Sequence, residues 1–212
     1  MLLSIVIPTI GRSCLQTVVD YALSVERPNI QVEVIVVNDC VTRNPIVLKE
    51  DSRVKIIEGP REGSAGAARN AGISRAGGEW IQFCDDDDFL HPNTGEWLNE
   101  VLHELPLVDT VVWRAVGFFD HLSPDFPIPP AESTSLKLGL VTLSFCIRNQ
   151  EKKLLFSPTK VVGDGNTCED FDYLVYAVNR GDRVAFGHRL AYGYRYPPPA
   201  HHNIFPIVLL KK

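Results

Sequence analysis

The sequence lacks several features that would place it in other protein classes. It contains no CxxC pair, and its five cysteines are scattered: Cys14, Cys40, Cys84, Cys146 and Cys168. A cysteine-based zinc site is therefore not expected. Reduced thiols in a cytoplasmic protein are the simplest interpretation.

Basic residues are in the minority, because 21 Lys and Arg face 26 Asp and Glu and give a net charge of -5. Nucleic-acid backbones attract basic surfaces, so this balance argues against a nucleic-acid binder. It does not exclude an anionic substrate, because a bound metal ion reverses the local sign of the charge.

Long apolar runs are also absent, since none approaches the ~20 residues that a membrane-spanning helix needs. Residues 1–8 have no basic region before their apolar run and are interpreted as a strand rather than a signal peptide. We therefore expect a cytoplasmic protein without a transmembrane segment, while peripheral association with the inner face of a membrane stays open. No repeat or low-complexity linker divides residues 1–212, which indicates one domain.

Strand and helix patterns alternate along the first half of the chain. Apolar runs predict strands at residues 3–7, 32–37, 54–57, 79–84 and 108–119, and helical spacing predicts helices at 15–23, 63–75 and 98–105. Ser13 is expected to cap the first helix, and Asn93 with Glu96 resembles a capping box. This alternation predicts an α/β fold with a mostly parallel sheet.

The second half is less regular. Strands or strand–helix mixtures are expected at residues 136–148 and 154–162, a helix at 171–178, and late strands at 183–186 and 190–196. Residues 123–130 contain four prolines and are expected to form a loop.

Four consecutive aspartates, residues 85–88, directly follow an apolar strand pattern. An acidic run is most often a solvated turn. However, four adjacent like charges repel one another, and a hard divalent cation with oxygen ligands relieves that conflict. Because side chains alternate along an extended segment, Asp85 and Asp87 are expected on one face and Asp86 and Asp88 on the other. An Asp-x-Asp pair on one face can hold a metal ion together with substrate phosphates.

Polar residues follow two other predicted strands, at Pro8-Thr9 and at Asn38-Asp39. In an open parallel sheet, ligands bind outside the carboxyl ends of the strands. Asp39 is either an ordinary turn residue or a carboxylate that accepts a hydrogen bond from the N–H of a uracil ring.

Two further charged sites have a plain and a functional interpretation. Arg69 is either a surface helix residue or, because its neighbours are small, a buried arginine that needs an anionic partner such as a diphosphate or the aspartates. Glu169 and Asp170 either complement a helix dipole or supply a general base.

Six segments occur in an order and spacing that is specific when they are taken together. They are residues 4–9 (SIVIPT), 36–39 (VVND), 68–72 (ARNAG), 79–88 (EWIQFCDDDD, with Pro92 following), 169–170 (ED) and 194–195 (YR). This set resembles the family 2 glycosyltransferases with the GT-A fold, in which the aspartate segment corresponds to the DXD motif. The resemblance extends over residues 3–196.

The resemblance implies a GT-A-like, Rossmann-type αβα sandwich with a mostly parallel central sheet. Residues 1–119 would form the nucleotide-binding half, and residues 120–212 the acceptor-binding half and C-terminal tail. It also implies a metal-dependent, inverting enzyme of the hexosyltransferase type that uses a nucleotide sugar, most often UDP-linked. The acceptor would be a saccharide, a lipid-linked compound or a small molecule, selected by residues 121–135 and the tail after residue 196. A homo-oligomer stays open.

The same resemblance assigns roles to individual residues. Asp39 would contact the base, Asp85 or Asp86 the ribose, and Pro8, Thr9, Arg12 and Arg69 other parts of the donor. Asp87, with Asp85 and Asp88, would ligate Mn²⁺ or Mg²⁺. Asp170 would be the catalytic base, with Glu169 as the second candidate.

The sequence departs from the family pattern at several positions. Ile10-Gly11 replaces Tyr-Asn, Asn38 and Cys40-Val41 change the second-strand turn, and Tyr196 stands where a histidine is common. His188, His201 and His202 are alternative histidine ligands.

Two other functions therefore stay open. One is a sugar nucleotidyltransferase, for which only Gly11-Arg12 offers a basic glycine loop. The other is an inactive nucleotide-sugar binding module.

Overall fold

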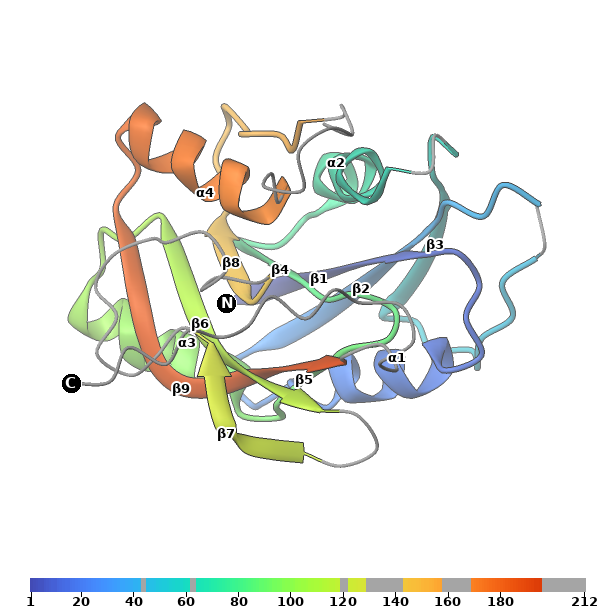
Figure 1. Ribbon diagram of the computed structural model, residues 1–212, viewed down its shortest axis with the longest axis horizontal. Helices are drawn as coiled ribbons and strands as arrows, with labels where there is room; N and C mark the ends of the chain where they lie inside the picture. The colour runs from blue at the N-terminus through green and yellow to red at the C-terminus, as the bar shows by residue number, and fades with distance from the viewer. Residues whose placement is uncertain (43–44, 62–63, 119–121, 129–142, 158–168, 196–212) are drawn as a thin grey trace.

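Helices cover both faces of a central sheet in the computed structural model, which describes residues 1–42, 45–61, 64–118, 122–128, 143–157 and 169–195 (Figure 1). The first half contains β1 (Leu2–Thr9), α1 (Leu15–Leu23), β2 (Gln31–Asn38), β3 (Val54–Glu58), α2 (Ala65–Arg75), β4 (Trp80–Phe83), β5 (Phe89–Leu90) and α3 (Thr94–Glu104). The second half contains β6 (Thr110–Phe118), β7 (Leu122–Ile128), β8 (Phe145–Arg148), α4 (Glu169–Arg180) and β9 (Val184–Arg195). The predicted α/β class is confirmed.

The described strands form one sheet in the order β3-β2-β1-β4-β8-β6-β9-β5, and β7 pairs with β6. β3, β2, β1 and β4 are mutually parallel, as expected, and β6 is parallel to β9. β8 runs antiparallel to both β4 and β6 and joins these two parallel parts. The carboxyl ends of β1, β2 and β4 therefore meet at one edge of the sheet.

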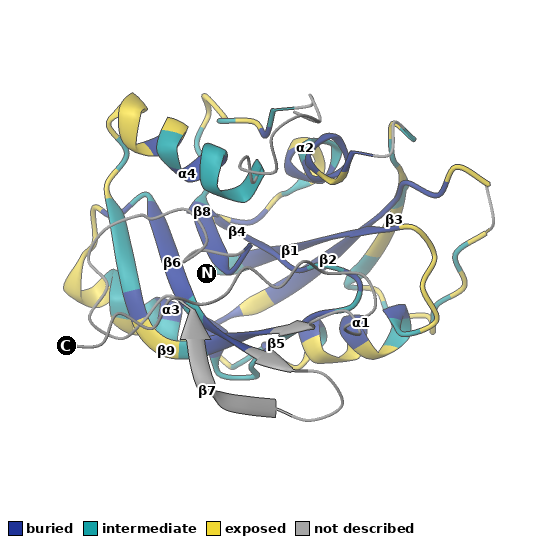
Figure 2. Cartoon of the chain, viewed as in Figure 1, coloured by how far each residue is buried: buried dark blue, intermediate teal, exposed yellow. Residues whose placement is uncertain are grey.

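Each face of the sheet has its own apolar core, and Figure 2 shows the central strands buried between them. Side-chain alternation along β1 produces this division, because Ile5 and Ile7 face one side and Val6 faces the other. α1 and α3 cover the first core with residues that include Val18 and Leu98. α2 and α4 cover the second core, as Figure 1 shows at the top of the molecule.

α2 packs very closely on the sheet because its residues are small. The side chain of Ser64 accepts a 3.3 Å hydrogen bond from the Ala67 N–H and caps the helix. At Gly72, an added Cβ would lie 2.3 Å from Cγ1 of Val6 on β1. A helix with larger side chains at this position would have to stand farther from the sheet.

Of the two predicted N-caps, Ser13 is wrong, while Asn93 does stand at the N-cap of α3 but forms no capping box. The residue before α1 is Cys14, not Ser13, and its side chain makes no capping hydrogen bond. Asn93 precedes α3 without a side-chain cap, because its Oδ1 accepts a 2.8 Å hydrogen bond from Arg27. The expected capping box is therefore replaced by a contact between two parts of the chain.

The proline-rich residues 123–130 were expected to form a loop, but residues 122–128 form strand β7. Among the described strands, β7 pairs with β6 alone, and a strand at an edge tolerates proline because its outward N–H groups need no ladder partner. The two late strands are one strand, β9, whose pairing with β6 shifts register. Strand β8 covers the end of the predicted 136–148 segment, residues 154–157 form no strand, and residues 136–142 and 158–162 lie outside the described part.

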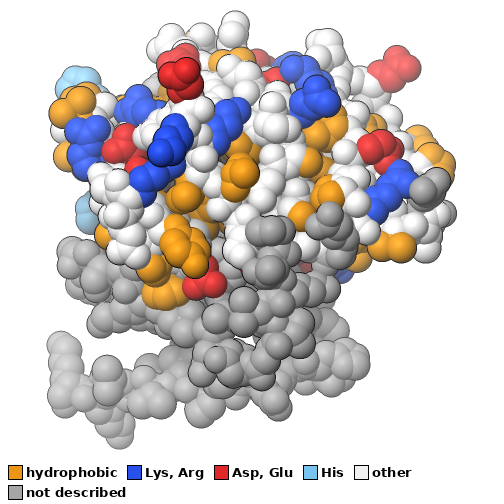
Figure 3. Space-filling model, turned by 90° about the horizontal axis from the view of Figure 1, so that it is seen from above, with side chains coloured by type: hydrophobic (Ala, Val, Ile, Leu, Met, Phe, Trp, Pro, Cys, Tyr) orange, Lys and Arg blue, Asp and Glu red, His pale blue; other side chains and the backbone are white. Residues whose placement is uncertain are grey.

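Seen from the side of α2 and α4, Lys and Arg side chains are interspersed with acidic and apolar ones (Figure 3). None of the helices within the described residues combines the length and apolar character needed to cross a bilayer.

Candidate active site

The ends of the parallel strands bring the predicted polar segments together. Thr9 at the end of β1 accepts a 2.9 Å hydrogen bond at its carbonyl from the Asp39 N–H, just after β2. The Thr9 hydroxyl donates a 2.6 Å hydrogen bond to Asp86, beyond β4. The segments that were expected to converge at this edge therefore do so. Pro8 lies in β1 itself, buried and paired with Val37.

Asp86 joins the loop after β1 to the acidic segment. Besides Thr9, its carboxylate accepts hydrogen bonds from Arg12 Nε at 2.8 Å and from the Ile10 N–H at 3.3 Å. Both oxygens are in use, and the residue is only 5% exposed. Asp86 thus fixes the position of Arg12 and Thr9.

Asp85 and Asp87 are the more open pair in the acidic segment, with 31% and 27% of their side chains exposed. Asp86 and Asp88 are buried, so the alternation expected from the sequence is present. Arg12 Nη1 lies 3.5 Å from Asp87, and Arg69 Nη2 lies 2.6 Å from Asp85. Each open carboxylate therefore faces a guanidinium.

Tyr192 on β9 contacts the acidic segment, and sequence reasoning missed it. Its buried hydroxyl donates a 2.8 Å hydrogen bond to Asp88 and accepts a 3.2 Å hydrogen bond from the Asp85 N–H. Burial, followed by the charge of Asp88, raises the pKa of this phenol, so Tyr192 keeps its proton as a donor. The segment 194–195 drew attention in the sequence, but nothing distinguished Tyr192 two residues earlier.

Arg69 connects the acidic segment to the start of α4. Its guanidinium pairs with Asp85, with Glu169 and, at 3.3 Å, with Asp170. The residue is 3% exposed, so the predicted burial with anionic partners is found. Burial alone would lower the pKa of Arg69, but the three carboxylates raise it above its ordinary value and keep the group charged.

Asp39, after β2, is buried and contacts the backbone of the loop that follows β3. Its Oδ1 accepts a 2.5 Å hydrogen bond from the N–H of Arg61. Arg61 has φ of 60°, a left-handed conformation that non-glycine residues seldom adopt. Asp39 therefore holds a strained turn beside the strand edge.

The three histidines considered as metal ligands are not found beside the acidic segment in the described part of the chain. His188 is exposed on β9, and its carbonyl accepts a hydrogen bond from Arg114. His201 and His202, like Tyr196, lie outside the described residues. The four described cysteines are free thiols, and burial raises the pKa of Cys84 beside the acidic segment.

The donor set at the acidic segment fits a hard divalent cation. No cluster of three or more His, Cys, Asp or Glu suited to a metal ion occurs among the described residues. A closed protein cage is therefore not seen in this part of the chain. Mg²⁺ and Mn²⁺ are commonly held by one or two carboxylates plus substrate phosphates and water, and the partly exposed carboxylates of Asp85 and Asp87 match that requirement.

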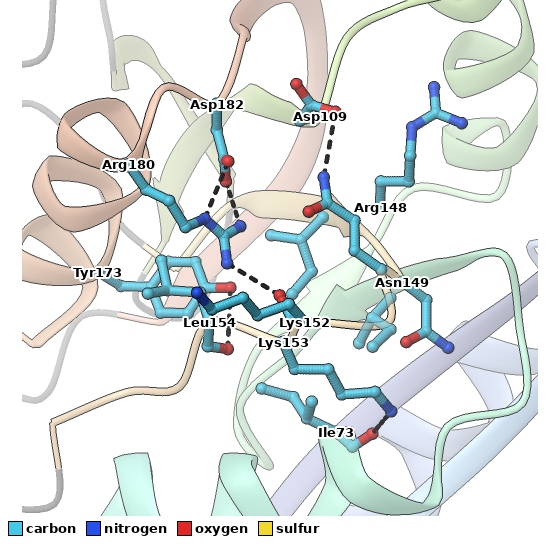
Figure 4. Close-up of a pocket in the computed structure, with 13 residues that line it drawn as sticks. Ile73, Asp109, Arg148, Asn149, Lys152, Lys153, Leu154, Tyr173, Arg180 and Asp182 are labelled. Atoms are coloured by element: carbon cyan, nitrogen blue, oxygen red, sulfur yellow. Dashed lines mark hydrogen bonds and ion pairs between the residues drawn. The ribbon is translucent and has the colours of Figure 1, made fainter.

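A separate cavity lies at the other end of α4, and Figure 4 shows its lining. Its free volume of about 10 Å³ is near the space of one water molecule, too small for a nucleotide. The lining groups are engaged with one another: Arg180 pairs with Asp182 and donates to the Lys152 carbonyl, and Lys153 donates to the Ile73 carbonyl. The contacts of Arg180 in this lining hold the C-terminal end of α4 in place, and the cavity is not the candidate active site.

The family model described as glycosyl transferase family 2 matches residues 4–139. Glycosyltransferase GlyG of Streptococcus pneumoniae is 33% identical over 109 residues, which cover 49% of this chain and 36% of that protein. Succinoglycan biosynthesis protein ExoO of Rhizobium meliloti is 42% identical over 67 residues, covering 30% of this chain and 19% of that protein. The matched segments thus span well under half of these relatives.

Solved structures share the fold. Residues 1–349 of S. aureus TarS in complex with UDP-GlcNAc superpose with a TM-score of 0.69 at 18% identity, covering 95% of this chain and 60% of that one. Glucosyl-3-phosphoglycerate synthase from Mycobacterium tuberculosis, in complex with Mn²⁺, UDP and phosphoglyceric acid, gives 0.58 at 16% identity, covering 92% and 71%. The GT-A-like fold expected from the sequence is confirmed.

Proposed function

The chain belongs to glycosyl transferase family 2, and from this premise we propose that it is a metal-dependent, inverting transferase that moves a sugar from a UDP-linked donor to an acceptor hydroxyl. The observation that carries the proposal is the open pair Asp85 and Asp87 at the edge of the parallel strands, of which Asp85 is joined through Arg69 to Asp170. We further propose that residues 1–119 bind the nucleotide and residues 120–212 bind the acceptor.

Donor binding is assigned to the ends of β1, β2 and β4. Asp39 contacts the uracil ring. Thr9 and Arg12, held in place by Asp86, face the rest of the donor. Of the two aspartates considered for the ribose, Asp85 is the more exposed. The complexes of TarS with UDP-GlcNAc and of the mycobacterial synthase with UDP support a uridine nucleotide.

Asp87 and Asp85 are the proposed ligands of Mn²⁺ or Mg²⁺. Asp88 is buried against Tyr192, so we assign it to the support of this turn. When bound, the cation acts as a Lewis acid on the diphosphate leaving group. Mn²⁺ in the mycobacterial synthase supports this assignment.

Asp170 is the proposed general base. It takes the proton of the acceptor hydroxyl as that oxygen bonds to the anomeric carbon and the bond from carbon to the diphosphate oxygen breaks on the opposite face. Arg69 Nη1 lies 3.3 Å from this carboxylate and holds it near the donor end of β4. Glu169, which also accepts a hydrogen bond from the Gly66 N–H, is the second candidate.

A thermal-shift screen of nucleotides and nucleotide sugars, with and without Mn²⁺, tests the donor class. A ligand that binds only the folded state raises the melting temperature, and we expect the largest shift with UDP or a UDP-sugar plus Mn²⁺. Incubation with UDP-sugars, and separately with nucleoside triphosphate plus sugar phosphate, then separates a glycosyltransferase from a nucleotidyltransferase by product. Binding without transfer or donor hydrolysis would indicate an inactive binding module.

A further inference from the structure

Arg69 lies between the proposed metal ligand Asp85, after β4, and the proposed base at the start of α4. Along the chain it is 16 residues from Asp85 and 100 residues from Glu169, yet its guanidinium reaches both. We propose that Arg69 is a positioning residue that holds the base on α4 at a fixed place relative to the donor end of β4. This inference rests on the proposed function, because the base and the donor are assigned there.

The enclosure of Arg69 favours this role over direct contact with the donor. Nη2 donates a 2.6 Å hydrogen bond to Asp85, while Nη1 faces Glu169 and Asp170. The guanidinium carbon lies 5.4 Å from the ring centre of Phe156, which covers it. A side chain that is 3% exposed and surrounded in this way acts through the carboxylates that it holds.

The two ends of α4 are fixed by different means. The far end is anchored at the cavity of Figure 4, where Arg180 Nη1 donates a 3.1 Å hydrogen bond to the Lys152 carbonyl. The first turn is joined to α2 by Glu169, whose carboxylate contacts Arg69 and the Gly66 N–H, and Asp170 follows directly. Figure 1 shows α2 and α4 on the same face of the sheet.

Gly66 makes this close approach of α2 and α4 feasible. An added Cβ at position 66 would lie 3.0 Å from Oε2 of Glu169 and 3.0 Å from Cβ of Phe156. Both contacts are tighter than ordinary van der Waals distances. The small residue therefore lets the first turn of α4 sit within reach of Arg69.

The planar fork of arginine suits this bridge. Its two terminal nitrogens point in fixed directions, so one cation binds carboxylates on two elements at once. A lysine supplies a single charged point and cannot hold both in the same geometry. Without the cation, Asp85, Glu169 and Asp170 repel one another, and the base moves away from the donor end of β4.

The test compares Arg69→Met and Arg69→Lys with Arg75→Met, an exposed arginine on the same helix. The assay is turnover of the UDP-sugar that the parent uses best, by transfer or donor hydrolysis. Since small displacements of a catalytic group cost up to ~100-fold in rate, we expect Arg69→Met to lower kcat by about 10–100-fold with KM within about threefold. Arg69→Lys restores only part of this loss, and Arg75→Met behaves as the parent.

A double mutant separates positioning from a general structural effect. If Arg69 acts through the base, Arg69→Met in an Asp170→Asn background lowers kcat by less than about threefold further, because coupled residues are not additive. Equal losses in both backgrounds, full rescue by lysine, or an Arg69→Met variant indistinguishable from Arg75→Met would overturn the proposal.

Failure of the proposed function is recognised separately. If the parent turns over no UDP-sugar, the catalytic assignment falls, whatever Arg69 does. The contact between Arg69 and Glu169 is then tested by measuring the free energy of unfolding of Arg69→Met, Glu169→Gln and the double variant. A coupling of about tenfold in the unfolding equilibrium constant supports it, and additive effects contradict it.

Discussion

The hydroxyl of Tyr192 donates a 2.8 Å hydrogen bond to Asp88, 104 residues earlier in the chain. The same oxygen accepts a hydrogen bond from the Asp85 N–H. β9, in the second half of the chain, therefore supports the acidic segment of the first half from behind. Asp85 and Asp87 can face outward because Asp88 is held inward.

Tyr192→Phe should lower the free energy of unfolding by about 1.5–3 kcal/mol, because a hydrogen bond to a buried charged group is lost. It should also weaken binding of UDP with Mn²⁺, since the acidic turn loses its support. Chemical unfolding and calorimetry measure the two effects. Tyr176→Phe is the control, because Tyr176 is 55% exposed on α4. Equal stability of the two variants would contradict the assigned role of Tyr192.

Asp170→Asn should reduce kcat by ~10²–10⁴-fold, the usual contribution of a positioned general base. UDP affinity should change little, because the base contacts the acceptor. Asp172→Asn, two residues later in the first turn of α4, controls for loss of a helix-dipole charge. Near-parent transfer by Asp170→Asn would move the assignment to Glu169.

Gly72→Ala should destabilise the protein by about 1–3 kcal/mol through overpacking of α2 on the sheet. The added methyl would lie 2.3 Å from Cγ1 of Val6, a strand residue that cannot move aside freely. Ser74→Ala on the exposed side of the same helix should change stability by less than about 0.5 kcal/mol. Thermal unfolding compares the two, and a neutral Gly72→Ala would mean that α2 stands farther from β1.

Glu33 should make stability depend on acid pH. Burial alone would raise its pKa, but hydrogen bonds from Lys55, the Ser4 hydroxyl and the Gly77 N–H lower it below its ordinary value. Because the folded pKa is the lower one, the stabilisation is complete above the unfolded value of about 4.3 and is lost as the pH falls through the folded pKa.

The Glu33→Gln variant should therefore lose less stability than the parent when the pH is lowered below about 4.3. Denaturant unfolding at a series of pH values measures this slope. Glu104→Gln, an exposed position at the end of α3, serves as the matched control. Identical slopes for Glu33→Gln and the parent would show that this network does not contribute.

The sequence predicted the parallel half of the fold because apolar runs and helical spacing are local signals. It placed β1 and β2 within a residue or two and found the acidic segment after β4. Asn93 was placed correctly at the start of α3, but its capping box does not form because its side chain accepts a hydrogen bond from Arg27, which only the folded chain brings near. The proline-rich strand β7 was missed because its pairing with β6 overrides local preference.

For the candidate site too, local signals were readable from the sequence and contacts between distant segments were not. Asp85, Arg69 and Asp170 stood out because charged residues beside apolar or small ones need an explanation. Tyr192 did not, because a tyrosine in an apolar strand usually belongs to the core. Its role depends on β9 passing behind the acidic segment, and no local pattern reports that contact.

Calorimetric titration of UDP in the presence and absence of Mn²⁺, on the parent and on Asp87→Asn, tests the central claim most directly. We expect Mn²⁺ to tighten UDP binding by the parent. In the presence of Mn²⁺, the Asp87→Asn variant should bind UDP at least about tenfold more weakly than the parent, because a ligand of the metal is removed. UDP binding that is the same with and without Mn²⁺, or the same in both proteins, would contradict the assignment of a metal and diphosphate to this edge of the sheet.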